Sequence, residues 1–120
     1  MPRMLWKPLD SHRNITKIKG DAMEAFTICV IYKAKSTQAR EDFINEISNT
    51  GILSLIRGED GCLTYDYYLS CDDNTKIVLF EAWRDKECQK VHMTQPHMEQ
   101  AMLIKSKYID SVELKEIKII

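Results

Sequence analysis

The chain has 120 residues, of which 17 are basic and 18 are acidic, and 44% are hydrophobic. This length fits one domain with a modest core, and the formal net charge of −1 gives no reason to expect nucleic acid or an anionic membrane as a partner. No stretch approaches the roughly 18 apolar residues of a membrane span, so we expect a cytoplasmic protein.

Residues 1–23 differ in composition from the rest of the chain. Their basic residues outnumber their acidic ones, and they show no sustained hydrophobic period. The basic residues are too sparse for a nucleic-acid-binding arm, and the segment lacks the apolar core of a signal peptide. We therefore expect an N-terminal extension over residues 1–23 and one folded domain over residues 24–120.

The first regular segment follows this extension and alternates with a period of two. Its residues from Phe26 to Tyr32 are mostly aromatic or β-branched, which predicts a strand buried on both faces. Ser36 then offers an N-cap for a helix whose apolar face comprises Phe43, Ile44, Ile47, Gly51 and Leu55. We expect this helix to end at Gly58, with the positive φ of a glycine C-cap.

Two further strands are expected over residues 62–69 and 76–83, joined by the polar turn at residues 72–74 as a hairpin. Asp85 caps a short helix that runs through His92, and Pro96 separates it from a second helix that ends near Tyr108. The last strand is expected over residues 112–120. Its apolar alternation changes phase, which predicts a β-bulge near Lys115-Glu116.

The expected order is β-α-β-β-α-α-β, which is an α+β fold of the ferredoxin-like split βαβ type with an antiparallel sheet. Helices that cover one face of such a sheet leave the other face open. Because the first strand is apolar on both faces, we expect a second sheet to pack there. In a chain this short, that sheet comes from a second subunit, so we expect a homodimer.

Three fragments of the sequence are similar to motifs of a known family. Arg57-Gly-Glu59-Asp-Gly61-Cys62-Leu-Thr-Tyr65 resembles E-P-G-C-x-x-Y, with Asp60 in place of the usual proline. Glu81-Ala-Trp83-Arg-Asp85 resembles E-x-W-x-(D/S), and His92-Met-Thr-Gln-Pro-His97 resembles H-x-x-(T/S)-x-H. All three motifs are typical of antibiotic biosynthesis monooxygenase domains, and the resemblance to that family covers about residues 24–120.

The resemblance implies a homodimer whose paired sheets form an α+β barrel, with a small-molecule pocket between the sheet and the helices of each subunit. Several members of the family oxidise phenols or quinol-like aromatics with molecular oxygen and use neither metal nor flavin. Others are isomerases or haem-degrading enzymes. We expect a monooxygenase without a cofactor, and the alternatives are an isomerase of a small, sometimes phosphorylated carbonyl compound and a ligand-binding dimer without catalysis.

The expected catalytic residues are His92 and Glu81. His92 matches the recurrent pocket histidine of the family, and an imidazole can remove a proton from a phenol near neutral pH. The structural alternative is that His92 caps the C-terminus of its own helix. Glu81 can orient a histidine or accept a substrate proton, or it can form a structural ion pair with Arg57 or Arg84.

The expected substrate-binding residues surround these two. Trp83 offers an indole wall, although core packing is the simpler interpretation for it. Tyr65 and Tyr67 offer hydroxyl groups, His97 follows Pro96, and Met93 offers an adaptable lining. Haem-degrading relatives also use an asparagine on the first strand, and residues 25–33 contain none. We therefore expect no haem, and no metal-binding motif is present.

Overall fold

The structure, a computed structural model, describes residues 25–118. The expected extension over residues 1–23 and the last two residues of the expected final strand lie outside these described residues. Within residues 25–118, no helix is long and apolar enough to cross a membrane.

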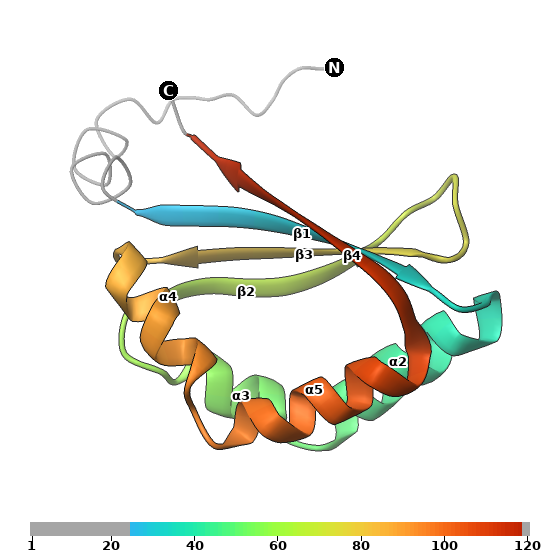
Figure 1. The fold of residues 1–120 in the computed structure, drawn as a ribbon, viewed down its shortest axis with the longest axis horizontal. Coiled ribbons are helices and arrows are strands. Elements are labelled where there is room, and N and C mark those ends of the chain that lie inside the picture. Colours follow the sequence, from blue (N-terminus) through green and yellow to red (C-terminus); the bar gives the residue numbers. More distant parts are fainter. Residues whose placement is uncertain (1–24, 119–120) are drawn as a thin grey trace.

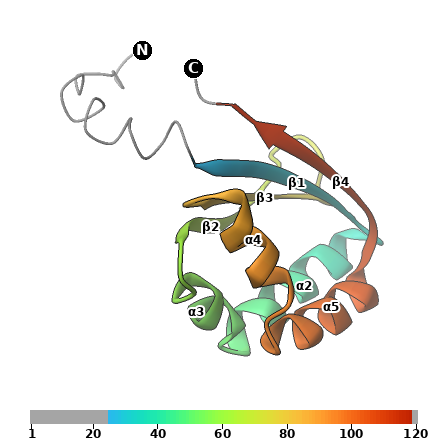
Figure 2. The same ribbon diagram turned by 60° about the vertical axis from the view of Figure 1, so that its left-hand side comes forward.

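The structure has four strands and four helices, which follow the expected order except that one predicted helix is divided in two. They are β1 (Phe26–Ala34), α2 (Thr37–Asn49), α3 (Ile52–Arg57), β2 (Cys62–Leu69), β3 (Lys76–Trp83), α4 (Lys86–Met93), α5 (His97–Tyr108) and β4 (Ile109–Ile117). The sheet has the order β2-β3-β1-β4, and all its neighbouring strands are antiparallel. The four helices lie on one side of the sheet (Figures 1 and 2), so the expected ferredoxin-like α+β fold is confirmed.

The predicted helix that follows β1 is two helices. It begins as expected, because the hydroxyl of Ser36 accepts a 3.0 Å hydrogen bond from the amide of Ala39. It breaks at Gly51, whose φ of 83° lies in the left-handed region, and α3 starts at the next residue. The break rotates the apolar face, so Leu55 is 55% exposed while Ile56 is buried.

The prediction that Gly58 ends this region with a positive φ is also wrong. Gly58 has a φ of −89°, and the left-handed conformation occurs at Gly61, where φ is 83°. Gly61 passes close to Cys88 of α4, because a Cβ atom built on it would lie 2.8 Å from the Cβ of Cys88. This glycine therefore allows the turn before β2 to approach α4.

The strand registers correct two further expectations. The pairing of β1 with β4 runs without interruption from Thr27–Ile117 to Lys33–Ser111, so the bulge predicted at Lys115-Glu116 is wrong. The irregularity lies at Asp110, because β4 already begins at Ile109, directly after α5. A second shift in β2 falls between Cys62 and Thr64 and leaves Leu63 exposed.

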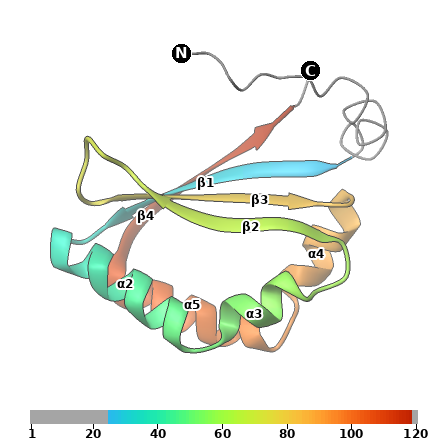
Figure 3. The ribbon, with the colours of Figure 1, turned by 180° about the vertical axis from the view of Figure 1, so that it is seen from behind.

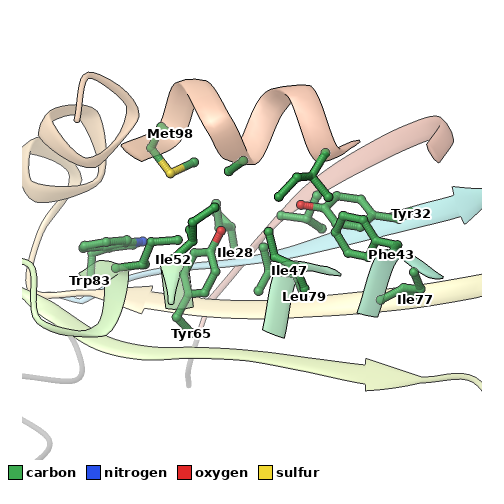
Figure 4. Close-up of a cluster of buried hydrophobic side chains, with 14 of the residues drawn as sticks. Ile28, Tyr32, Phe43, Ile47, Ile52, Tyr65, Ile77, Leu79, Trp83 and Met98 are labelled. Atoms are coloured by element: carbon green, nitrogen blue, oxygen red, sulfur yellow. The ribbon is translucent and has the colours of Figure 1, made fainter. Parts of the chain in front are cut away.

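The core lies between the sheet and the helices. Phe43 and Ile47 of α2 face Tyr32 of β1 and Leu79 of β3, and all four side chains are buried (Figure 4). The ring of Tyr32 meets that of Phe43 edge-on, with 5.8 Å between the ring centroids. Trp83, Tyr65 and Met98 form the other end of this cluster, beside α4.

The opposite face of the sheet carries no helix of the described chain (Figures 1 and 3). Its middle on β1 and β3 is apolar and half-buried in the isolated chain, with Cys29, Ile31, Val78, Phe80 and Ala82. This face fits the expected packing of a second sheet, and the homodimer remains a prediction.

Candidate functional site

His92 lies in the last turn of α4 and is 1% exposed. Helix α4 begins where the carboxylate of Asp85 accepts a 2.9 Å hydrogen bond from the amide of Cys88, and this start places His92 two turns later on the side that faces the sheet. The imidazole lies 4.6 Å from the indole of Trp83 and 5.5 Å from the ring of Tyr65, measured between ring centroids. The structure therefore brings together three of the predicted site residues.

The carboxylate of Glu59 joins two histidines on two helices. Its Oε1 and Oε2 lie 3.0 and 3.2 Å from Nδ1 of His92, and its Oε2 lies 2.6 Å from Nε2 of His97, the first residue of α5. All three side chains are shielded from solvent, with exposed fractions of 9% for Glu59, 1% for His92 and 16% for His97. His92 thus bonds to a carboxylate, and the expected alternative, a cap on its own helix, does not describe this contact.

Two tight turns produce this arrangement. The amide of Glu59 donates to the carbonyl of Ile56, and the amide of Cys62 donates to the carbonyl of Glu59, at 3.0 and 3.1 Å. On the other side, the amide of Gln95 donates to the carbonyl of His92 at 3.1 Å and closes the turn between α4 and α5. The two histidines therefore stand on either side of one short turn and face the same carboxylate.

Burial lowers the pKa of His92 below its usual value, and the nearby Glu59 only partly opposes this effect. His92 is therefore neutral at neutral pH, with one ring nitrogen protonated. An ionised Glu59 accepts a hydrogen bond but cannot donate one, so the proton of His92 lies on Nδ1 and Nε2 carries the free electron pair.

Glu81 lies beneath the sheet and is 5% exposed. Its Oε1 accepts a 2.8 Å hydrogen bond from Nε1 of Trp83, and burial raises its pKa despite this bond. The expected ion pair with Arg57 or Arg84 is absent from the described residues. Arg57 donates to the carbonyl of Tyr65 at 3.0 Å, and Arg84 forms an ion pair with Asp60, 2.9 Å away.

Tyr65 and Tyr67 lie on the helix-facing side of β2. Tyr65 is 4% exposed, and its ring meets those of Tyr67 and Trp83 edge-on at centroid distances of 6.1 and 6.5 Å. Burial raises the pKa of Tyr67 to about 12, although hydrogen bonding to Tyr32 and Tyr65 lowers it. These phenols remain protonated at neutral pH and are hydrogen-bond donors inside the fold.

Met93 does not join this cluster. Its side chain is 49% exposed and borders a surface hollow formed by the turn between α4 and α5, together with Met98 and Met102. Of the expected substrate-binding residues, the structure thus places Trp83, Tyr65, Tyr67 and His97 close to His92 or to one another, and Met93 outside.

Two surface hollows border the buried polar groups. One, of about 360 Å³, is lined by Glu59, Asp60, Arg84, Cys88, Val91 and Gln95, among others, next to the contact between Glu59 and His92. Another, of about 470 Å³, lies between α5 and β4 and includes Lys105. The ammonium of Lys105 lies 5.2 Å from the ring centroid of Tyr32, and burial lowers its pKa despite the attraction of Glu81.

Sequence reasoning missed Glu59 and Lys105 as members of the site. Glu59 stands between the turn residues Gly58 and Gly61, and its place in the first family motif predicts no role for it. An acidic residue in a glycine-bounded turn, followed by two histidines five residues apart, is the signal that was available. Within residues 25–118, no group of three His, Cys, Asp or Glu side chains is arranged to hold a metal ion.

Solved structures of other proteins share this fold. A conserved protein from Methanosarcina mazei Go1 has a TM-score of 0.75 at 17% identity, over 83% of this chain and 97% of that protein. A protein from Nitrosomonas europaea, provisionally assigned as an antibiotic biosynthesis monooxygenase, has a TM-score of 0.69 at 20% identity, over 81% and 91% of the two chains. At these identities the likeness concerns the fold alone.

Sequence comparison gives a shorter match and a family. The uncharacterised protein YjcS of Bacillus subtilis (strain 168) is 38% identical over 39 residues, which span 32% of this chain and only 37% of YjcS. The family model described as antibiotic biosynthesis monooxygenase matches residues 22–102, a range that covers more than half of the chain and includes Glu59, Glu81, Trp83, His92 and His97. The chain therefore belongs to the antibiotic biosynthesis monooxygenase family.

Proposed function

We propose that this protein is a cofactor-independent monooxygenase that oxidises a small phenol or quinol with molecular oxygen. The observation that carries the proposal is the neutral imidazole of His92, held by Glu59 at 3.0 Å and packed against Trp83 and Tyr65. The family match and a structural relative from Bacteroides thetaiotaomicron, for which an oxidoreductase activity is suggested, agree with this class of reaction.

The first step is proton removal. Nε2 of His92 takes the hydroxyl proton of the substrate, and the negative charge of Glu59 stabilises the imidazolium that forms. The resulting phenolate is electron-rich enough to give an electron to oxygen. The aromatic surfaces of Trp83 and Tyr65 provide apolar contacts for a planar ring, and they exclude water from the reacting atoms.

The redox balance needs no further reductant. With a hydroquinone as substrate, one atom of O2 replaces a ring hydrogen and the other leaves as water, so hydroquinone and O2 give hydroxyquinone and H2O. The substrate loses the four electrons that O2 gains. Simple oxidation would instead give quinone and hydrogen peroxide, which makes the two outcomes chemically distinct.

Glu81 acts on this reaction through Trp83. Its hydrogen bond to Nε1 fixes the plane of the indole that lies against His92. Because His92 is 1% exposed, a substrate reaches Nε2 only when neighbouring side chains move. The proposal therefore includes a small displacement of α4 or α5 when the ligand binds.

The test is oxygen consumption by metal-stripped protein with a panel of hydroquinones and polyphenols, with 18O2 and with catalase present. We expect uptake that survives chelation, one 18O atom in the product, and no oxygen returned by catalase. His92→Gln removes the base and should abolish uptake, whereas Lys90→Ala, on the exposed side of the same helix, should not. Uptake that yields only peroxide overturns the monooxygenase reaction, because the protein then merely oxidises the quinol. No uptake across the panel overturns the proposal in favour of an isomerase or a ligand-binding dimer.

A further inference from the structure

A buried carboxylate that contacts two imidazoles determines which ring nitrogen of each must present an N–H to it. Glu59 offers Oε1 to His92 and Oε2 to His97, at 3.0 and 2.6 Å, and its side chain is 9% exposed. A carboxylate withdrawn from water is stable only where hydrogen-bond donors replace the water. Each imidazole must therefore turn an N–H toward Glu59.

This requirement selects one tautomer for the neutral His92. His92 carries its proton on Nδ1, and His97 turns its Nε2–H toward Glu59. For His92 the consequence is functional, because only the Nδ1–H tautomer has a free electron pair on Nε2 and can accept a substrate proton there. Without the carboxylate, neutral histidine exchanges between two tautomers, and one of them cannot act as a base at Nε2.

We propose that Glu59 and His97 are positioning residues for His92: Glu59 fixes its tautomer and stabilises its imidazolium, and His97 holds the carboxylate of Glu59 in its orientation. The catalytic part of this statement rests on the proposed function, but the tautomer does not. Of the three side chains, His97 is the one closest to solvent, because it is 16% exposed. It therefore connects the buried contact between Glu59 and His92 to the surface.

Other charged groups face the same cluster and affect its charge balance. Lys105 of α5 lies near enough to His92 to lower its pKa, and Glu81 of β3 interacts with Glu59 across the core. On the outer side, the hollow beside Glu59 carries Asp60, Arg84, Asp85 and Glu87. None of these groups accepts or donates a hydrogen bond to either imidazole among the described residues, so the orienting contacts of His92 and His97 are those to Glu59.

The test is 15N NMR of the histidine side chains, which is feasible because the full chain contains three histidines. We expect the Nδ1–H tautomer for His92 in the wild type from pH 7 to 8. Glu59→Gln keeps the size of the side chain and removes its charge, so the pKa of His92 should fall further and both tautomers should appear. Glu99→Gln, an exposed change in the first turn of α5, is the matched control. It should alter neither the pKa of His92 nor its tautomer.

The two variants of His97 separate positioning from simple packing. His97→Gln retains an N–H donor for Glu59 and should keep the tautomer of His92, whereas His97→Leu removes the donor and should broaden or mix its signals. In oxygen uptake, Glu59→Gln should lower kcat at least about 10- to 100-fold with little change in KM, which is the order found for groups that orient a metal-bound histidine. The kcat of His97→Leu should lie between those of Glu59→Gln and the wild type. The kcat of His97→Gln should be close to that of the wild type.

Two results overturn the inference: an Nε2–H tautomer for His92 in the wild type, or an unchanged tautomer and pKa in Glu59→Gln. If the NMR results are as expected but no oxygen is consumed, the proposed function fails while the positioning by Glu59 and His97 stands. If uptake is present and Glu59→Gln lowers kcat without any NMR change, the role assigned to Glu59 fails alone.

Discussion

The indole Nε1 of Trp83 donates a 2.8 Å hydrogen bond to Oε1 of Glu81, two residues earlier on β3, and both side chains lie between the sheet and the helices. Alternate residues of a strand share one face, so a single strand supplies both members of this buried pair. The indole N–H and the carboxylate each provide the hydrogen-bond partner that the other needs in a region without water. The pair explains how a carboxylate is tolerated beneath the centre of the sheet.

Loss of this acceptor should destabilise the fold. Glu81→Ala leaves the indole N–H of Trp83 without a partner and opens a void, and should cost about 2–4 kcal/mol of unfolding free energy. Glu81→Gln keeps an acceptor oxygen and removes a buried charge, so it should stay within about 1 kcal/mol of the wild type. Urea denaturation at pH 7 measures both, and equal losses in the two variants would show that the hydrogen bond is not the cause.

The buried His92 predicts a pH dependence of stability. Burial lowers its folded-state pKa below the usual 6.5, so in the interval below pH 6.5 the unfolded chain binds this proton more readily than the folded one. The contribution of His92 is therefore fully present above pH 6.5 and declines as the pH falls toward the lowered pKa, by at most about 1.4 kcal/mol per pH unit. Denaturation midpoints of the wild type and His92→Gln between pH 5 and 8 should converge at the acid end. If the midpoints of the two proteins instead differ by the same amount at every pH, the lowered pKa of His92 does not contribute to the pH dependence.

Two glycines with the same φ make a matched comparison. Gly51 and Gly61 both have a φ of 83°, but a Cβ on Gly51 meets nothing within 4 Å, whereas one on Gly61 would overlap Cys88. Gly51→Ala should therefore cost only the left-handed strain, about 1–2 kcal/mol. Gly61→Ala adds a collision with α4 and should cost about 3–5 kcal/mol. Thermal or urea denaturation gives both values, and similar losses would mean that α4 moves aside freely.

The open face of the sheet predicts association with a second copy. Phe80 lies on this face and is half-buried in the isolated chain, so Phe80→Glu would place a charge inside the expected interface. Light scattering at micromolar concentration should show a dimer for the wild type and a monomer for Phe80→Glu. Leu55→Glu, on an exposed position of α3, is the control and should remain dimeric. A monomeric wild type would contradict the predicted homodimer.

Much of the fold could be predicted from local sequence pattern. The bounds of β2 and β3 and the caps at Ser36 and Asp85 follow from alternation and from side chains that accept backbone hydrogen bonds. The division at Gly51 could not be seen, because apolar residues continue at helical spacing on both sides of it. The bulge was misplaced for a related reason: the register of β4 depends on where α5 ends, and the phase of its own side chains does not reveal that.

The candidate site shows a sharper limit. His92, Trp83 and Tyr65 were identified because each occupies a motif position on a regular element. Glu59 lies in a turn, where no periodicity shows which way a side chain points, and its partners follow 33 and 38 residues later. Only the folded chain brings these groups together. Met93, next to His92 in sequence, points elsewhere because adjacent residues of a helix are about 100° apart.

The turn between α4 and α5 has a mechanical consequence. Glu59 holds the last turn of α4 through His92 and the first turn of α5 through His97, so neither helix end can leave the sheet without losing a contact to the same carboxylate. A ligand that needs room beside Trp83 must therefore displace the two helix ends together, or break one histidine contact before the other. In the first case the imidazole keeps its orientation while the ligand enters, and the base is already aligned when the substrate arrives.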